Sequence, residues 1–179
     1  MVEEPAGLGK WLMKTHKHMK RTKQELEVRE MLEGLGVEYE EQFSIRLGKN
    51  DGRPGVRLED GVSWIVVDFL VRLDGVEAGD KRDVIIECAR LTLGRSRSRK
   101  KMMERIRQRA YGFEMRFFEI KRYYRDVVCV ALIEAPERGV AEYTRARIPS
   151  ADVVVDSISE LRNVLINLEG VRETQMSSQ

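Results

Sequence analysis

Two acidic residues interrupt two very apolar segments of this chain. Asp68 lies within residues 64–71 and Glu87 lies within residues 83–89. Both segments are rich in β-branched residues, and the glycines between them favour a turn, so we predict a β-hairpin. Folding this hairpin about the middle of its connection, near residues 76–78, places Asp68 directly opposite Glu87.

Two carboxylates in this position need compensation. Side chains alternate between the faces of a strand, so Asp68 and Glu87 share one face of the predicted sheet. Like charges that face each other across strands are destabilising, and carboxylates are seldom buried without a partner. A hard divalent cation, which prefers carboxylate oxygens, is one compensation. An arginine from a neighbouring helix, with no metal, is the alternative.

The elements that must position this pair follow from hydrophobic periodicity and from helix and turn signals. The expected order is α-β-β-β-α-β-β-α. Because an apolar sheet is most simply buried by flanking helices, the predicted fold class is α/β with a mixed central sheet. The predicted helices are residues 11–35, 98–111 (with Gly112 as its stop) and 157–168; the predicted strands are 37–47, 63–73, 83–89, 115–120 and 126–135; and residues 49–61 are a predicted loop.

This order, with acids at these points, resembles the PD-(D/E)xK restriction-endonuclease-like nucleases, and in particular the very-short-patch repair endonucleases and the archaeal Holliday-junction resolvases. In that family an opening helix carries a glutamate, a strand carries an aspartate and the next strand carries Glu-x-Lys. The matching segments here are residues 22–42, 65–71 and 84–89. The resemblance implies a restriction-endonuclease-like fold and a metal-dependent endonuclease that acts on DNA. It also implies Asp68 and Glu87 as ligands of Mg²⁺ or Mn²⁺.

The same resemblance implies Glu25 as a supporting carboxylate. Thr22-Lys-Gln-Glu25 is also the pattern of a capping box, so the alternative is that Glu25 only caps its helix.

One position departs from the family pattern. Ala89 stands where the motif lysine is expected, two residues after Glu87. Lys100 and Lys101, from the following helix, are the candidates to replace it. Arg90 could contact the phosphate instead, although its side chain should point to the opposite face of the sheet. The absence of the motif lysine also supports a different kind of function, that of a non-catalytic nucleic-acid-binding or assembly subunit that keeps the fold.

Basic residues are concentrated in two stretches. Residues 95–109 contain eight arginines and lysines and one acid, Glu104, while residues 10–23 contain six basic residues and no acid. Solvated faces normally mix both signs, and arginine gives bidentate contacts to phosphate. We therefore predict nucleic-acid binding, with DNA favoured over RNA; a contact with an acidic partner protein is the weaker alternative. The predicted contact residues are Lys17, Lys20, Arg21, Arg95, Arg97, Arg99, Arg105 and Arg109.

Length and composition fit one domain. The 179 residues are 42% hydrophobic and 35% charged, with a net charge of +2. We expect a basic arm over residues 1–23, one nuclease-like domain over 24–169 and a disordered tail over 170–179. The resolvase resemblance implies a homodimer.

Some classes of protein are excluded or disfavoured by motif. The chain has no phosphate loop, dinucleotide-binding fingerprint or serine-nucleophile elbow, which argues against nucleotide-driven and serine-hydrolase chemistry. No apolar run is long enough to cross a membrane, and no secretion signal is evident. We expect a cytoplasmic protein whose Cys88 and Cys129 are small apolar thiols.

Overall fold

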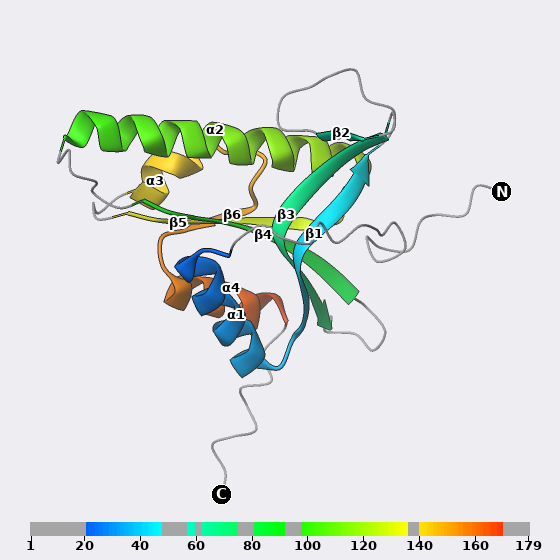
Figure 1. Cartoon of the computed structure of the whole chain (residues 1–179). Coiled ribbons are helices and arrows are strands. Elements are labelled where there is room, and N and C mark those ends of the chain that lie inside the picture. Colours follow the sequence, from blue (N-terminus) through cyan, green and yellow to red (C-terminus); the bar gives the residue numbers. More distant parts are fainter. Residues whose placement is uncertain are drawn as a thin grey trace, which may run out of the picture.

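The computed structural model describes residues 21–47, 57–59, 62–74, 81–91, 98–135 and 140–169. A six-stranded mixed sheet forms the centre, with helices on both faces (Figure 1). This confirms the predicted α/β class. Its strands are β1 (Glu38–Leu47), β2 (Arg57–Glu59), β3 (Val62–Asp74), β4 (Lys81–Arg90), β5 (Val128–Glu134) and β6 (Val153–Val155); its helices are α1 (Lys23–Leu35), α2 (Arg99–Tyr123), α3 (Val140–Arg145) and α4 (Ile158–Leu168).

The strand order is β1-β3-β4-β5-β6, with β2 also paired to β3. β1, β3 and β4 pair antiparallel, whereas β4, β5 and β6 pair parallel. A parallel pair needs a long crossover between its strands. α2 provides the crossover between β4 and β5, and this is why a helix must follow the strand that carries Glu87.

Each face of the sheet has its own apolar core. α2 and α3 cover one face, and α1 and α4 cover the other (Figure 1). Ile85 and Phe117 belong to the core under α2, while Ile86 and Leu32 belong to the core under α1. Because both faces of β4 are covered, its sequence is almost continuously apolar, and a charged residue there stands out.

The sequence-based prediction of a strand at residues 115–120 is wrong. These residues belong to α2, which runs through Gly112, the predicted stop. The apolar stripe of α2 continues past the glycine at helical spacing, so that Phe113, Phe117 and Ile120 are buried against the sheet. A glycine inside a helix costs about 1 kcal/mol, and three buried side chains outweigh that cost.

Three short elements were not predicted from the sequence, namely β2, α3 and β6. Each has only three to six residues, too few for a periodic pattern to show. In contrast, the ends of the longer helices follow local rules. Thr22 forms the predicted capping box with Glu25, Ser157 caps α4 by accepting from the Glu160 N–H, and Gly36 ends α1 with a φ of 67°.

None of the helices in the described part of the chain is both long enough and apolar enough to cross a membrane.

Candidate functional site

Asp68 and Glu87 lie where two strands separate. β3 and β4 pair from Asp74 opposite Lys81 up to Phe69 opposite Ile86, so the next facing positions are Asp68 and Glu87. This confirms the register predicted from the sequence. Beyond this point β3 continues beside β1, and β4 continues beside β5. The two acids therefore stand at the point where the sheet opens.

The carboxylate of Asp68 replaces the missing strand partner. Its Oδ2 accepts a hydrogen bond from the Cys88 backbone N–H at 2.7 Å. A backbone N–H left unpaired inside a protein would cost about 1–3 kcal/mol. Burial raises the pKa of Asp68 above its ordinary value, while the Cys88 N–H and the charges of Arg116 and Arg109 act in the opposite direction.

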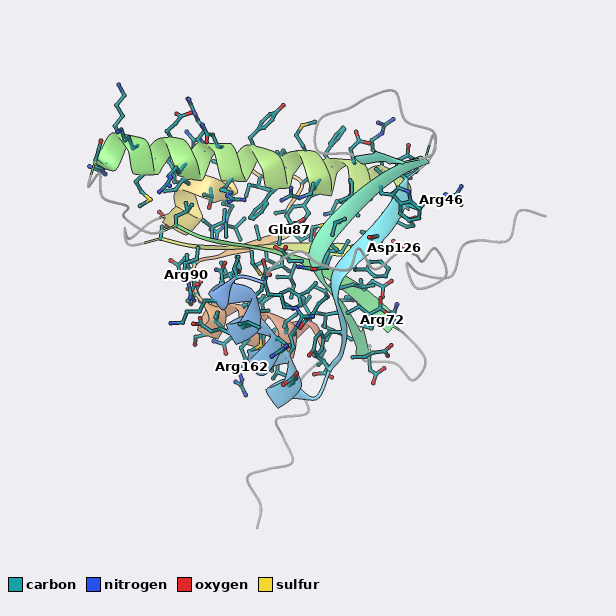
Figure 2. All side chains as sticks on the ribbon, viewed as in Figure 1. Arg46, Arg72, Glu87, Arg90, Asp126 and Arg162 are labelled. Atoms are coloured by element: carbon teal, nitrogen blue, oxygen red, sulfur yellow. The ribbon has the colours of Figure 1, made fainter. Side chains whose placement is uncertain are left out.

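Glu87 is almost completely buried, with 2% of its surface exposed. It projects into the layer between the sheet and α2 (Figure 2), where Arg116 of α2 binds both of its oxygens. Nε donates to Oε1 at 2.7 Å, and Nη2 donates to Oε2 at 3.3 Å. The structure thus shows the arginine partner from a neighbouring helix that the alternative expected for Glu87.

The pKa of Glu87 is raised well above its ordinary value, first by burial and second by the negative charge of Asp68. Arg116 opposes this shift. The Asp68 and Glu87 carboxyls also hydrogen-bond to each other, which lowers the pKa of Asp68 and raises that of Glu87. Of the two carboxyls, Glu87 is the one whose pKa the contact between them raises.

Glu25 approaches Asp68 from α1. It caps its own helix, because its carboxylate accepts from the Thr22 N–H at 3.1 Å, and this confirms the predicted capping box. Its pKa is nevertheless raised, mainly by burial, with a contribution from the charge of Asp68. Glu25 thus combines the capping role with a place near the acid pair.

A buried glutamine fixes the start of α1 at this place. Gln24 is 2% exposed, and its Nε2 donates to the Ala89 carbonyl at 3.3 Å and to Glu134 Oε2 at 2.8 Å. These two bonds tie α1 to the ends of β4 and β5. They set the approach of Glu25 to the acid pair, and no sequence pattern predicts them.

The structure does not bring Lys100 and Lys101 to the carboxylates. Both precede Arg116, which contacts Glu87, by 15 or more positions in one continuous helix, a separation of about 23 Å along its axis. They cannot replace the motif lysine, and Arg116 is the basic group at this place instead. Because residues 115–120 were interpreted as a strand, Arg116 was not singled out. Its spacing of seven from Arg109 would have placed both on one helical face.

Arg90 points away from the site, as predicted. Its guanidinium pairs with Glu27 of α1 and with Glu134, the latter at 2.7 Å, on the face opposite α2 (Figure 2). Ala89 is buried in the core under α2, with 6% of its surface exposed.

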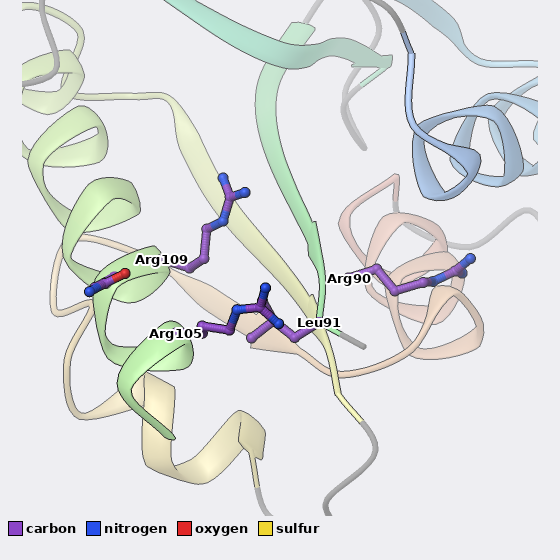
Figure 3. Close-up of a pocket in the computed structure, with 5 residues that line it drawn as sticks. Arg90, Leu91, Arg105 and Arg109 are labelled. Carbon is purple, nitrogen blue, oxygen red and sulfur yellow. The ribbon is translucent and has the colours of Figure 1, made fainter. Parts of the chain in front are cut away.

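A pocket of about 450 Å³ lies between the first half of α2 and the end of β4. Arg105, Gln108 and Arg109 line it from α2, and Arg90 and Leu91 line it from β4 and the residue after it (Figure 3). Two of the predicted nucleic-acid contacts, Arg105 and Arg109, therefore share one concave surface. It lies on the same side of the sheet as Glu87, and the charge of Arg109 lowers the pKa of Asp68.

The other predicted contacts are scattered. Arg99 opens α2 and is exposed, whereas Arg21 forms an ion pair with Glu41 of β1. Lys17, Lys20, Arg95 and Arg97 lie outside the described residues, as do most of the predicted basic arm and the predicted tail over 170–179.

The acid pair has the donor chemistry that a hard divalent cation requires. Its oxygens belong to carboxyl groups, and burial, the first cause of both raised pKa values, disfavours their charged forms when no cation is present. A cation would compete with Arg116 for Glu87. Among the described side chains no group of three or more acids, histidines or cysteines is arranged to hold a metal. Two protein ligands suit Mg²⁺, which usually keeps several waters.

The comparisons with known proteins give no match. No family model matches the chain, and neither a curated protein nor a solved structure is significantly similar to it.

Proposed function

We propose that this chain is a metal-dependent endonuclease that acts on DNA phosphodiesters and has a restriction-endonuclease-like fold. One observation carries the proposal: two carboxyls with raised pKa values face each other where β3 and β4 separate, beside arginines from α2. Carboxyls whose pKa values are shifted by burial and by each other are typical of functional sites.

Asp68 and Glu87 would hold Mg²⁺ or Mn²⁺. Such an ion activates a water molecule and balances charge on the phosphate. Arg116 fixes the orientation of Glu87 through both of its oxygens. Arg109, whose charge acts on Asp68, would contact the phosphate.

The proton from the attacking water needs an acceptor other than Arg116. A guanidinium stays protonated at every physiological pH, so Arg116 can supply charge and hydrogen bonds but cannot act as a base. Glu25 is the candidate, because its raised pKa makes its carboxylate a better proton acceptor than an ordinary glutamate.

A second candidate function is a nucleic-acid-binding or assembly subunit without catalysis. The specific observation in its favour is that Arg116 binds both oxygens of Glu87 while Ala89 replaces the motif lysine. In this case the arginine would stand permanently in place of a cation.

The test uses the full chain with supercoiled, single-stranded and branched DNA in Mg²⁺ or Mn²⁺. We expect wild-type cleavage, and a loss of at least about 100-fold in Asp68→Asn and Glu87→Gln. Asp152→Asn is the matched control, because Asp152 likewise accepts a strand N–H, that of Cys129 at 2.8 Å, but has Lys121 as its partner. It should cleave like the wild type.

Metal binding is measured separately, from the melting temperature without DNA. At a metal concentration of 100 times Kd, stability should rise by about 2.7 kcal/mol in the wild type and in Asp152→Asn, and not in Asp68→Asn. A wild type that binds DNA, does not cut it and shows no stabilisation by metal would contradict the nuclease and support the binding subunit.

A further inference from the structure

The pocket beside α2 has features of its own that the acid pair does not explain. It is a concave space of about 450 Å³ and is large enough for a small anionic group. Among the described residues, those that line it are three arginines, a glutamine and a leucine, with no carboxylate. A pocket of this composition selects for an anion.

Its cationic groups come from one helix. Arg105 and Arg109 are four positions apart, so their Cβ atoms lie about 6 Å apart on one face of α2. Both extend from α2 on the same side of the sheet, with Arg105 beside Leu91 at the end of β4, whereas Arg90 extends to the other side of the strand (Figure 3). There Glu27 and Glu134 neutralise Arg90. The guanidiniums on the pocket side of the strand are therefore those of Arg105 and Arg109.

The shape of the site favours the end of a strand over its interior. An internal phosphodiester carries one negative charge, and the strand must continue on both sides of it. A terminal phosphate carries about −1.5 to −2 charges and three acceptor oxygens, and it continues on one side only. Two neighbouring guanidiniums in a concave pocket match the second case in charge and in geometry.

We propose that this pocket binds the terminal phosphate of a nucleic-acid strand, a phosphomonoester, through Arg105 and Arg109. The nucleic-acid part of this ligand rests on the proposed function. Arg109 lines the pocket on the same helix that brings Arg116 to Glu87, so the bound end and the acid pair both lie on the α2 side of the sheet. The protein would then act on, or be retained at, phosphorylated strand ends in preference to uninterrupted strands.

The experiment measures binding by fluorescence anisotropy in EDTA, where no metal can act. Labelled oligonucleotides of one sequence carry a 5′-phosphate, a 3′-phosphate or hydroxyls at both ends. A fourth is one nucleotide longer without a terminal phosphate, so that it has one more internal charge. We expect at least one phosphorylated end to be bound about tenfold more tightly than both unphosphorylated strands.

Variants connect this preference to the pocket. Arg105→Ala and Arg109→Ala should each reduce it several-fold, and the double variant should abolish it. Arg162→Ala, the control, removes an exposed arginine on α4 at the opposite face and should leave it unchanged (Figure 2). Equal binding of all four strands by the wild type would overturn the proposal, as would a preference that persists in the double variant.

The outcome is independent of catalysis. Asp68→Asn should keep the preference for a phosphorylated end, because Asp68 does not line the pocket. If cleavage fails and the end preference remains, only the nuclease proposal is lost. If cleavage occurs and all four strands bind equally, only the terminal-phosphate proposal is lost.

Discussion

At the residue scale, the centre of the molecule is a cluster of two carboxyls and one guanidinium. Glu87 is buried between Asp68 and Arg116, and burial is the first cause of its raised pKa. A glutamate whose pKa is raised by folding binds more protons in the folded state than in the unfolded state. The contribution of Glu87 to the free energy of unfolding is then fully present below its pKa in the unfolded chain, near 4.5. This contribution is lost as the pH rises through the pKa of Glu87 in the folded protein.

Glu87→Gln should remove this dependence. The amide imitates the protonated carboxyl, since its oxygen can accept from Arg116 and its NH₂ can donate to Asp68. In denaturant titrations from pH 5 to pH 8 we expect the variant to gain stability relative to the wild type as the pH rises. A difference that is constant with pH, or that moves in the opposite direction, would show that Glu87 is ionised in the folded protein over this range.

At the scale of elements, α2 has the largest effect on the site. It supplies Arg116 to Glu87 and lines the pocket through Arg105 and Arg109. These contacts exist only because the helix continues without a break from Arg99 to Tyr123. Gly112, in its middle, is the weakest point of that continuity.

Gly112→Ala should stabilise the protein by about 0.5–1 kcal/mol. A Cβ at Gly112 would meet nothing within 4 Å, so only the helix propensity changes. Equilibrium unfolding in urea measures the effect. Gly36→Ala is the contrasting variant: it has open space too, but its φ of 67° is strained for alanine, so it should destabilise by about 1 kcal/mol. A loss of stability in Gly112→Ala would mean that α2 is not continuous there.

At the scale of the whole molecule, the small net charge of +2 hides an uneven distribution. The α2 side of the sheet presents Arg105 and Arg109 around one pocket, while Arg90, on the α1 side, is neutralised by Glu27 and Glu134. A polyanion should therefore bind on the α2 side.

The salt dependence of DNA binding tests this asymmetry. Each phosphate contact that is lost should reduce the slope of log K against log salt concentration by about 1. We expect Arg105→Ala with Arg109→Ala to reduce the slope by about 2 and Arg162→Ala to leave it as in the wild type. If the double variant and Arg162→Ala change the slope equally, the DNA does not bind preferentially on the α2 side.

The sequence by itself determined the parts that depend on neighbours along the chain. The side chains of β3 and β4 alternate between the two faces of the sheet, and only a short segment of chain connects the two strands. These two facts were enough to place Asp68 opposite Glu87. The caps at Thr22 and Ser157 likewise depend on residues three positions away. Such local rules operate before any tertiary contact forms.

Only the tertiary structure decided what surrounds that pair. Arg116 is 29 residues from Glu87, and Gln24 is 65 residues from the Ala89 carbonyl that it binds. α2 continues past Gly112 because Phe113, Phe117 and Ile120 are buried against the sheet. The strands of that sheet come from other parts of the chain, so the sequence of the helix alone does not reveal this packing. The energy of packing overrode a local helix-ending signal, and the same packing brought Arg116 to Glu87.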